Sequence, residues 1–424
     1  MQACRQDECR PLTESAAEAH VAGTCFKTGP PGRVGVELEW LLHDARDPLL
    51  PVPASRLDGV LVPVLVHGAL STEPGGQLEL SSRPAPTLAE CLVETSADLA
   101  ALRTAAARRG VRLAGLGVDP VRPPTRLVDT PRYLAMERYF DRHGPDGRVM
   151  MCSTASVQVC LEAGTADDGF AVRWNALHAI GPVLVAAFAN SPVRAGRPTG
   201  WRSTRQAVWA RLGADRGLAP AGRNGRNGGG PGTADPAADW ARRALDADVL
   251  AIQVAEGPWE VPTGLSFRAW LRGEGPRRPT VADLDYHLTT LFPPVRPRGC
   301  LELRVLDAQS GDRWRVAATV VAALLDDPAA RDLALAAAEP VGGRWLAAAR
   351  DGLSDPRFAV AARACFSAAL DGAVRLGAPA QVVAELVDFI ERFPEAGRCP
   401  ADDVLDVWVS QPDRIPLVEE SVPC

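Results

Sequence analysis

The chain has 424 residues, of which 46% are hydrophobic and 23% are charged, a balance typical of folded globular proteins and unlike that of disordered or collagen-like chains. Its net charge of −6 offers no basic face to a nucleic-acid backbone, so we expect no nucleic-acid partner. Lys27 is the only lysine and precedes the first predicted strand, which argues against both a Walker-type phosphate-binding lysine and a Schiff-base lysine.

The first 30 residues show no hydrophobic periodicity. They mix charged residues with Gly and Pro, and the turn Gly-Pro-Pro-Gly follows at 29–32. They also lack the apolar stretch of a signal peptide. We therefore expect a disordered leader over 1–30, a single folded domain over 31–424 and a cytoplasmic protein.

Alternating apolar and polar residues predict strands, and apolar residues at helical spacing predict helices. The expected strands are 33–42, 76–82, 153–161 and 300–306. The expected helices are 87–109, 172–190, 314–338 and 357–392, the last of these forming part of a helical C-terminal region. Because strands and helices are interspersed, the simplest assembly is one mixed sheet covered by helices.

Two further segments bear on the organisation of the chain. The longest apolar run, near 176–190, contains Gly181 and Pro182 and is shorter than the roughly 20 residues of a membrane span, so we expect no membrane partner. The Gly-, Asn- and Pro-rich segment 221–239 predicts a long mobile loop. The ten cysteines show no spacing suited to zinc, and we expect reduced thiols.

The polar faces of the predicted strands carry the candidate chemistry. Side chains two residues apart on a strand share a face, so Glu37 lies beside Glu39 and Glu302 beside Arg304. Glu79 and Gln158 occupy the polar faces of the other two strands. Any one of these strands alone is most simply a half-buried strand with a solvated face. If the faces converge, four glutamates without a neighbouring lysine must protonate or bind cations, and oxygen ligands favour Mg²⁺ or Mn²⁺ with nucleotide phosphates.

Six short motifs in order resemble the glutamate–cysteine ligase family of the GCS2 type. They are Gly35-Val-Glu-Leu-Glu39, Glu73-Pro-Gly-Gly-Gln-Leu-Glu79, Thr154-Ala-Ser-Val-Gln158, Phe188-Ala-Asn-Ser-Pro192, His287-Leu-Thr-Thr-Leu-Phe-Pro293 and Leu301-Glu-Leu-Arg304. The resemblance covers about 33–320, and the Arg- and Ala-rich composition resembles the actinobacterial branch that feeds ergothioneine biosynthesis.

The resemblance implies an α+β fold in which a curved, mainly antiparallel sheet forms a funnel-like half-barrel covered by helices, as in glutamine synthetase and guanidino kinases. ATP and metals would bind at one end and amino acids at the other. It also implies ATP-dependent ligation of the glutamate γ-carboxylate to the cysteine amine through γ-glutamyl phosphate. The expected ligands are therefore L-glutamate, L-cysteine, ATP and Mg²⁺, with Mn²⁺ as an alternative metal; no protein partner is implied.

The same resemblance assigns roles to individual residues. Arg205 would bind the α-carboxylate of glutamate, and Arg304 would stabilise the transferring phosphoryl group through a bidentate contact. Arg304 also has a purely structural interpretation, an ion pair with Glu302. Arg216 would contact ATP, although its surroundings depart from the family pattern. The expected metal ligands are Glu37, Glu39, Glu79 and Glu302, with Glu73 and Gln158 as substrate-contacting residues.

Several conspicuous residues have structural interpretations. Asn190-Ser-Pro192 reads as a helix stop, His287 as a hydrogen-bonded residue near a helix start, and the helical tryptophans Trp174, Trp209 and Trp314 as core. Cys160 is not expected to be catalytic unless its pKa is lowered. The alternatives to cysteine ligation are ligation of glutamate to another amine, a guanidino-kinase-like phosphotransferase and a non-catalytic metal- or nucleotide-binding protein.

Overall fold

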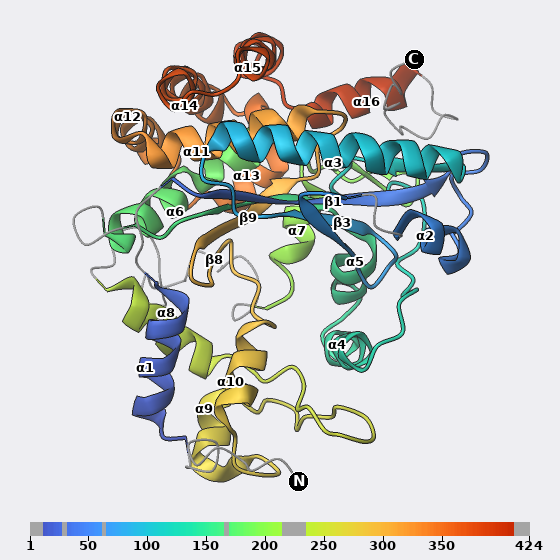
Figure 1. Ribbon diagram of the computed structural model, residues 1–424, viewed down its shortest axis with the longest axis vertical. Helices are drawn as coiled ribbons and strands as arrows, with labels where there is room; N and C mark the ends of the chain where they lie inside the picture. Colours follow the sequence, from blue (N-terminus) through green and yellow to red (C-terminus); the bar gives the residue numbers. More distant parts are fainter. Residues whose placement is uncertain (1–11, 28–31, 62–64, 165–168, 214–234, 411–424) are drawn as a thin grey trace.

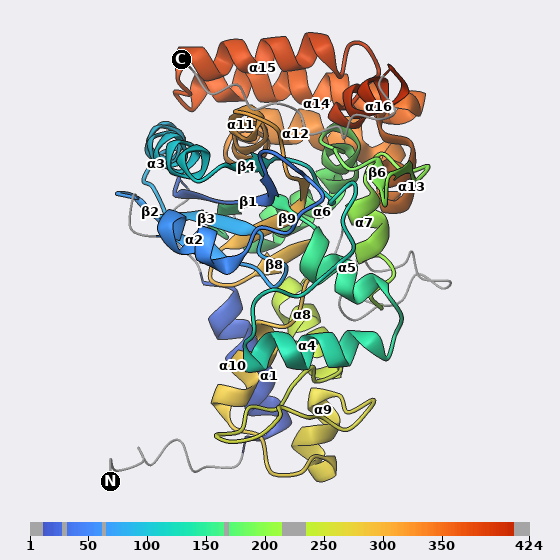
Figure 2. The same cartoon turned by 90° about the vertical axis from the view of Figure 1, so that its right-hand side faces the viewer.

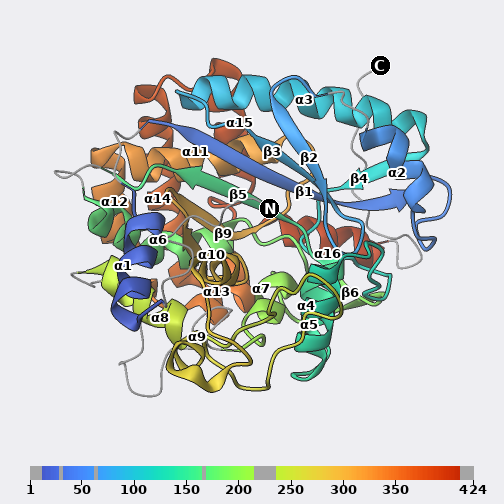
Figure 3. The ribbon, with the colours of Figure 1, turned by 60° about the horizontal axis from the view of Figure 1, so that its bottom comes forward.

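The computed structural model describes residues 12–27, 32–61, 65–164, 169–213 and 235–410. Its centre is a seven-stranded sheet in the order β2-β3-β1-β5-β9-β8, with β4 paired to the far end of β1. All these pairs are antiparallel, and the sheet curves without closing (Figures 1 and 3). The strands are β1 Val34–Asp44, β2 Gly68–Thr72, β3 Leu78–Ser82, β4 Val111–Ala114, β5 Ser156–Leu161, β8 Val295–Pro297 and β9 Leu301–Asp307.

Helices in two layers cover the apolar face of the sheet, above it in Figure 1. Val36, Leu38 and Trp40 of β1 share one core with the helices nearest the sheet. Those helices are α3 Leu88–Arg108, α6 Phe170–Ala187 and α11 Arg313–Asp326. Beyond them lie α12 Pro328–Ala338, α14 Pro356–Arg375, α15 Ala380–Arg392 and α16 Pro400–Ser410, which Figure 2 shows from the side. Helix α13 Trp345–Asp351 packs beside α6 and α7.

The strongly apolar helix α6 belongs to this core. It is long and apolar enough to cross a membrane by length and composition, but most of it is buried inside the protein. Arg173 near its start is fully buried and donates to the backbone oxygen of Glu162 at 3.0 Å. Because α6 packs between the sheet and α12, α13 and α14, its apolar surface is accounted for by the fold.

Shorter helices lie on the other side of the sheet, below it in Figure 1. They are α1 Glu14–Cys25, α4 Pro131–Asp141, α5 Asp146–Ser153, α7 Thr204–Trp209, α8 Pro236–Asp246, α9 Phe267–Ala269 with the π-turn Trp270–Glu274, and α10 Val281–Leu288. Helix α2 Ala54–Leu61 lies near the β4 end of β1, and β6 Val193–Arg194 pairs only with β7 Arg197–Pro198. The polar face of the sheet therefore looks towards this second group of helices.

The expected α+β architecture with a curved antiparallel sheet is confirmed, and each predicted strand overlaps an observed one. The short strands β2, β4 and β8 escaped prediction because three to five residues carry too little periodicity. The predicted helices over 314–338 and 357–392 are each divided in two. Asp327 ends α11 and caps α12, and a turn containing Gly377 and Pro379 separates α14 from α15.

Of two expectations about irregular segments, the disordered leader is wrong over its second half, and the loop over 221–239 is contradicted only at its end. The leader over 1–30 contains α1, whose Thr13 side chain caps the helix and whose Glu14 pairs with Arg268 at 2.9 Å and with Arg272 at 2.7 Å. Most of the expected loop 221–239 lies outside the described residues, but its last residues begin α8. There Asp235 caps the helix and Pro236 occupies its first turn. An Asp followed by Pro is typical of a helix start, but the many Gly and Asn residues before it favoured a loop prediction.

Candidate active site

Strand register brings the predicted carboxylates together on the polar face of the sheet. Glu39 of β1 lies directly opposite Glu79 of β3, and Glu37 lies opposite Gln158 of β5. Glu302 of β9 lies opposite Cys160, two residues further along β5. Paired residues of adjacent strands project to the same face. The predicted convergence of these side chains is therefore confirmed.

A chain of hydrogen bonds links the middle of this face. The Gln158 amide nitrogen donates to Glu39 Oε1 at 2.7 Å, and Arg304 Nη1 donates to the Gln158 amide oxygen. The same Arg304 nitrogen donates to Glu302 Oε1 at 2.6 Å. Gln158 therefore joins the carboxylate of β1 to the guanidinium of β9 and fixes the orientation of both.

Glu302 is fully buried and engaged by arginines. Arg296 donates to it through Nε at 2.6 Å and through Nη2 at 2.9 Å, and Arg304 adds the contact described above. Burial opposes ionisation of Glu302, but the charges of Arg304 and Arg296 outweigh it and lower its pKa to about 2. The ion pair considered as a structural role for Arg304 is thus present, and Glu302 is an arginine-bound anion as well as a predicted metal ligand.

The other carboxylates lack such compensation. Burial, together with the charges of Glu302 and Glu79, raises the pKa of Glu37 to about 7. Burial, together with Glu39 and Glu79, raises the pKa of Glu73 to about 8. Burial also raises the pKa values of Glu39 and Glu79, although Ser71 Oγ and Ser81 Oγ donate to Glu79 at 3.0 and 3.1 Å. Neighbouring arginines only partly offset the cost of ionising these carboxyls, so they keep their protons to a higher pH than free glutamate does.

Such a face suits a cation, but the carboxylates do not form a complete cage. Among the described residues, no group of three or more His, Cys, Asp or Glu side chains is placed to hold a metal ion. Glu37, Glu39 and Glu79 have the hard oxygen donors and the excess charge that Mg²⁺ prefers, and Mg²⁺ commonly takes its remaining ligands from water and phosphate. The donor set therefore fits a cation shared with a phosphorylated substrate. The metal roles of Glu37, Glu39, Glu79 and Glu302 stay predictions.

Arg205 is buried on α7 at one end of this face. Its Nη2 donates to the backbone oxygen of Arg304 at 2.9 Å, and its guanidinium carbon lies 5.7 Å from the centre of the Trp209 ring. Its Nε and Nη1, like Nε of Arg304, are buried without a hydrogen-bond partner, although Nη1 lies 3.9 Å from Asp307. Buried guanidinium groups with unused donors are suited to an incoming carboxylate or phosphate.

Asp307 at the end of β9 positions α7, and the sequence analysis missed it. Its carboxylate accepts hydrogen bonds from the Asn190 backbone nitrogen at 2.8 Å, Ser191 Oγ at 2.7 Å and Ser203 Oγ at 2.9 Å. Ser203 in turn caps α7, which carries Arg205. The alternation of side chains could have revealed it. Asp307 lies on the same apolar face of β9 as Leu301, Leu303 and Val305, and a charged group buried there needs hydrogen-bond partners.

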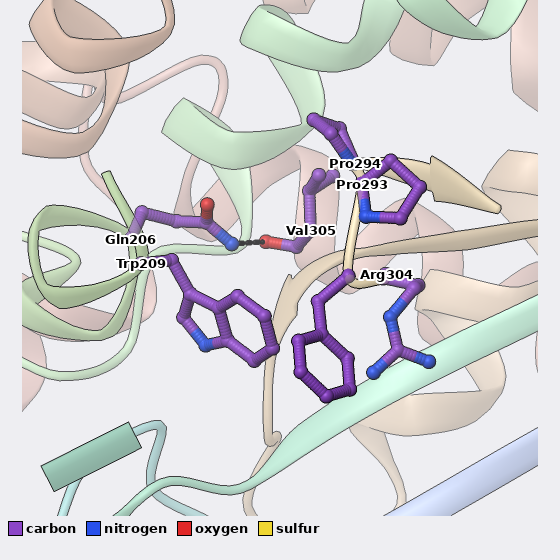
Figure 4. Close-up of a pocket in the computed structure, with 7 residues that line it drawn as sticks. Gln206, Trp209, Pro293, Pro294, Arg304 and Val305 are labelled. Atoms are coloured by element: carbon purple, nitrogen blue, oxygen red, sulfur yellow. Dashed lines mark hydrogen bonds between the residues drawn. The ribbon is translucent and has the colours of Figure 1, made fainter. Parts of the chain in front are cut away.

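A small cavity lies beside Arg304 and Trp209 (Figure 4). Its volume is about 10 Å³, close to the space needed by one water molecule. Phe292 and Pro293 form much of its apolar wall, and the Gln206 amide nitrogen donates to the backbone oxygen of Val305 at 2.7 Å. Trp209, expected as a core residue, thus packs against Phe292 and also faces the site.

Other residues singled out in the sequence have structural positions. Trp174 and Trp314 are buried, and Asn190 Nδ2 donates to the backbone oxygens of Gly115 and Ala308 at 2.7 and 2.8 Å. His287 lies at the end of α10, not its start, and its Nε2 is 2.7 Å from the backbone oxygen of Ala244.

The cysteines of the described segments are free thiols, as expected. A hydrogen bond with Cys300 and burial raise the pKa of Cys160, so it lacks the lowered pKa of a reactive thiol. Glu73 lies near Glu39 and Glu79, as its proposed role at the site requires, whereas Arg216 lies outside the described residues.

Comparison with known proteins identifies relatives across most of the chain. The model of Glutamate-cysteine ligase family 2 (GCS2) matches residues 33–420. The glutamate–cysteine ligase EgtA of Mycobacterium tuberculosis is 40% identical over 413 residues, covering 94% of this chain and 91% of the relative. The chloroplastic glutamate–cysteine ligase of Brassica juncea is 31% identical over 333 residues, covering 72% of this chain and 62% of the relative.

A solved structure supports the fold. The glutamate–cysteine ligase of Francisella tularensis in complex with AMP superimposes with a TM-score of 0.55 at 14% sequence identity. The match covers 94% of this chain and 91% of that chain. At this identity the comparison concerns the fold, which both chains share.

Proposed function

This chain belongs to glutamate–cysteine ligase family 2, and on that premise we propose that it joins the γ-carboxylate of L-glutamate to the amine of L-cysteine while ATP is converted to ADP and phosphate. The observation that carries this proposal is the position of Arg205 and Arg304. Both have buried, unused guanidinium donors at the edge of a carboxylate-lined face. A substrate with a carboxylate at one end and a phosphorylated group near the acidic face satisfies both features.

The reaction would proceed in two displacements. An oxygen of the glutamate γ-carboxylate forms a bond to the γ-phosphorus of ATP while the bond from that phosphorus to the bridging oxygen breaks, releasing ADP and leaving γ-glutamyl phosphate. The cysteine nitrogen then bonds to the acyl carbon, inorganic phosphate departs with the C–O bond electrons, and the amine loses a proton. Splitting the ligation in this way replaces a poor leaving group, oxide, by phosphate.

The residues of this chain would bind and orient the reactants. Arg205 would bind the α-carboxylate of glutamate, and Arg304 would donate to the transferring phosphoryl group from the position that Gln158 and Glu302 fix. Glu37, Glu39 and Glu79 would hold Mg²⁺, which neutralises charge on the nucleotide phosphates when bound. Glu73 would border the amino-acid substrate, and the proposed ATP contact of Arg216 rests on resemblance alone.

The acceptor amine is less sharply defined by the site than glutamate is. The small cavity beside Trp209 and Phe292 is about the size of one water molecule, which favours an acceptor with a small side chain over a bulky one. We propose that the product, γ-glutamylcysteine, feeds ergothioneine biosynthesis in the cytoplasm, in line with the similarity to the EgtA proteins.

A coupled assay tests the proposal directly. Purified protein is supplied with ATP, Mg²⁺ and glutamate, together with cysteine, α-aminobutyrate, serine or no amine, and both ADP release and product mass are measured. We expect ADP and γ-glutamylcysteine in equal amounts with cysteine, and weaker turnover with serine. ADP release with a different amine and none with cysteine would show ligation of glutamate to another acceptor. No ADP with any amine would contradict the ligase assignment.

A further inference from the structure

Two cysteines lie together beside Glu302 on the acidic face. Among the seven cysteines that the structure describes, Cys160 and Cys300 are the two that are partly exposed, and the other five are buried. The side chains of Cys160 and Cys300 are hydrogen-bonded to each other. This thiol pair therefore has what disulfide formation requires, namely access from solvent and a second sulfur within reach.

Strand register explains why the two thiols meet. Cys160 of β5 lies directly opposite Glu302 of β9, and Cys300 comes two residues before Glu302. Strands β5 and β9 are neighbours in the sheet (Figure 3). Because side chains two residues apart share a face, Cys300 projects to the same face as Glu302 and Cys160. On β1 the partner of Cys160 is Gly35, which has no side chain to cover the thiol pair.

The thiol pair borders the groups assigned to phosphoryl transfer. The carboxylates of Glu37 and Glu302 interact electrostatically with both thiols. Glu302 in turn accepts a hydrogen bond from Arg304 Nη1 at 2.6 Å. A covalent change at the thiol pair thus lies next to the carboxylate that holds Arg304 in place.

A disulfide between these cysteines would change the local backbone. Because Cys160 faces Glu302 directly, Cys300 is its diagonal neighbour on the adjacent strand. Diagonal neighbours have Cα atoms about 7–8 Å apart, whereas disulfide-linked residues usually have Cα atoms about 4.4–6.8 Å apart. Closing the bond therefore draws the start of β9 towards β5 and displaces Glu302, and with it the guanidinium of Arg304.

We propose that Cys160 and Cys300 form an oxidation site, at which a small-molecule disulfide converts the thiol pair into a protein disulfide and lowers ligase activity. The effect on ligation rests on the proposed function. Ligation would then fall when the thiol pool, which includes the proposed acceptor cysteine, becomes oxidised.

The chemistry is two successive thiol–disulfide exchanges. The thiolate of one cysteine attacks a sulfur of the small disulfide, whose S–S bond breaks and releases one small thiolate. The second cysteine loses its proton, and its sulfur attacks the protein sulfur of the mixed disulfide and releases the other small thiolate. The two protein thiols are oxidised, the small disulfide is reduced to two thiols, and the two protons end on those thiols.

Mass spectrometry and a thiol-free activity assay test this proposal together. Wild type, the double variant Cys160→Ser/Cys300→Ser and the control Cys365→Ala are treated with 2-hydroxyethyl disulfide or with dithiothreitol and then desalted. Cys365 is a buried thiol on α14. Tryptic peptides locate any disulfide, and far-UV circular dichroism checks the fold of each variant. Activity is measured as ADP release with ATP, Mg²⁺, glutamate and α-aminobutyrate, because this acceptor has no thiol to reduce the bond.

We expect oxidised wild type to yield a peptide pair joined through Cys160 and Cys300 and to release ADP about tenfold more slowly or less, because a displacement of about 1 Å in positioning groups can cost that much. Dithiothreitol should restore its activity, and the control should behave as wild type does. The double variant should be as active as reduced wild type under both treatments.

Three results would overturn the proposal: no joined peptide pair in oxidised wild type, a joined pair with unchanged activity, or an equal loss of activity in the double variant. Absence of a γ-glutamyl product from reduced wild type would instead contradict the proposed function, and the peptide analysis would still decide whether the thiol pair forms a disulfide.

Discussion

Replacing Glu37 with Gln removes a carboxyl group whose ionisation is unfavourable in the folded, metal-free protein. Its side chain is 19% exposed, and burial with neighbouring carboxylates raises its pKa from 4.5 to about 7. A rise of this size corresponds to about 3 kcal/mol of unfavourable free energy once the folded protein is fully ionised, which partial solvation reduces to about 2 kcal/mol. We therefore expect Glu37→Gln to stabilise the metal-free protein at pH 8 by about 2 kcal/mol and to abolish ligation.

The sign of this effect depends on pH. Between pH 4.5 and about 7, the folded state holds a proton on Glu37 that the unfolded chain has released, so wild-type stability falls as pH rises through this window. At pH 5 the folded wild type carries a neutral Glu37, and the advantage of the variant should nearly vanish. Mg²⁺ at pH 8 should also reduce the stability difference between Glu37→Gln and wild type, because the metal binds and stabilises the wild-type protein.

Urea unfolding at pH 5 and pH 8, with EDTA or Mg²⁺, measures these differences. Glu391→Gln, an exposed glutamate on α15, is the matched control and should change stability little at either pH. If Glu37→Gln raises the free energy of unfolding by the same amount at pH 5 and pH 8, the electrostatic explanation is refuted. Full ligase activity in Glu37→Gln would refute the metal-binding role.

Four further outcomes follow from the site geometry. Arg205→Lys should raise the KM for glutamate about tenfold or more with little change in MgATP binding, because an ammonium group cannot replace the two parallel hydrogen bonds of a planar guanidinium. Equal effects on glutamate and MgATP would contradict the assignment of Arg205 to glutamate. Arg304→Lys should lower kcat about 10²–10³-fold with an unchanged circular dichroism spectrum, and near-normal kcat would exclude a role in phosphoryl transfer. Mg²⁺ affinity, measured by calorimetry, should rise from pH 6 to pH 8 with proton release, because the pKa of Glu37 is raised to about 7 and its carboxyl must lose a proton to bind metal; a pH-independent affinity would argue against Glu37 as a ligand. Asp307→Asn should lower the free energy of unfolding by about 1–3 kcal/mol and raise the KM for glutamate through displacement of α7, and a loss of stability without a change in KM would make Asp307 purely structural.

The sequence predicted the chemistry of the site through side-chain alternation. A period of two residues places Glu37 and Glu39, or Glu302 and Arg304, on one face whatever the fold, and antiparallel register then aligns them across strands. Which strands are neighbours is a tertiary property. The adjacency of β1 to both β3 and β5, which brings Glu79 and Gln158 to the same place, was not predicted and is seen only in the structure.

The remaining features depended on contacts distant in sequence. Arg296 and Arg298 lie on and after a three-residue strand with no periodic signal, yet their charges lie within 4.0 Å of the Glu302 carboxylate. Helix α1 is held by ion pairs from Glu14 to Arg268 and Arg272, some 250 residues away, which local composition cannot reveal. Such long-range partners hold a segment of weak periodicity in the fold.

The central claim is that the glutamate γ-carboxylate is activated by phosphorylation and then captured by cysteine. Glutamate labelled with ¹⁸O in its γ-carboxylate tests it in a single experiment with ATP, Mg²⁺ and cysteine, analysed by mass spectrometry of the products. One ¹⁸O should appear in inorganic phosphate for each γ-glutamylcysteine formed, because the oxygen that attacks ATP leaves with phosphate. Unlabelled phosphate, or ADP without γ-glutamylcysteine, would contradict the account.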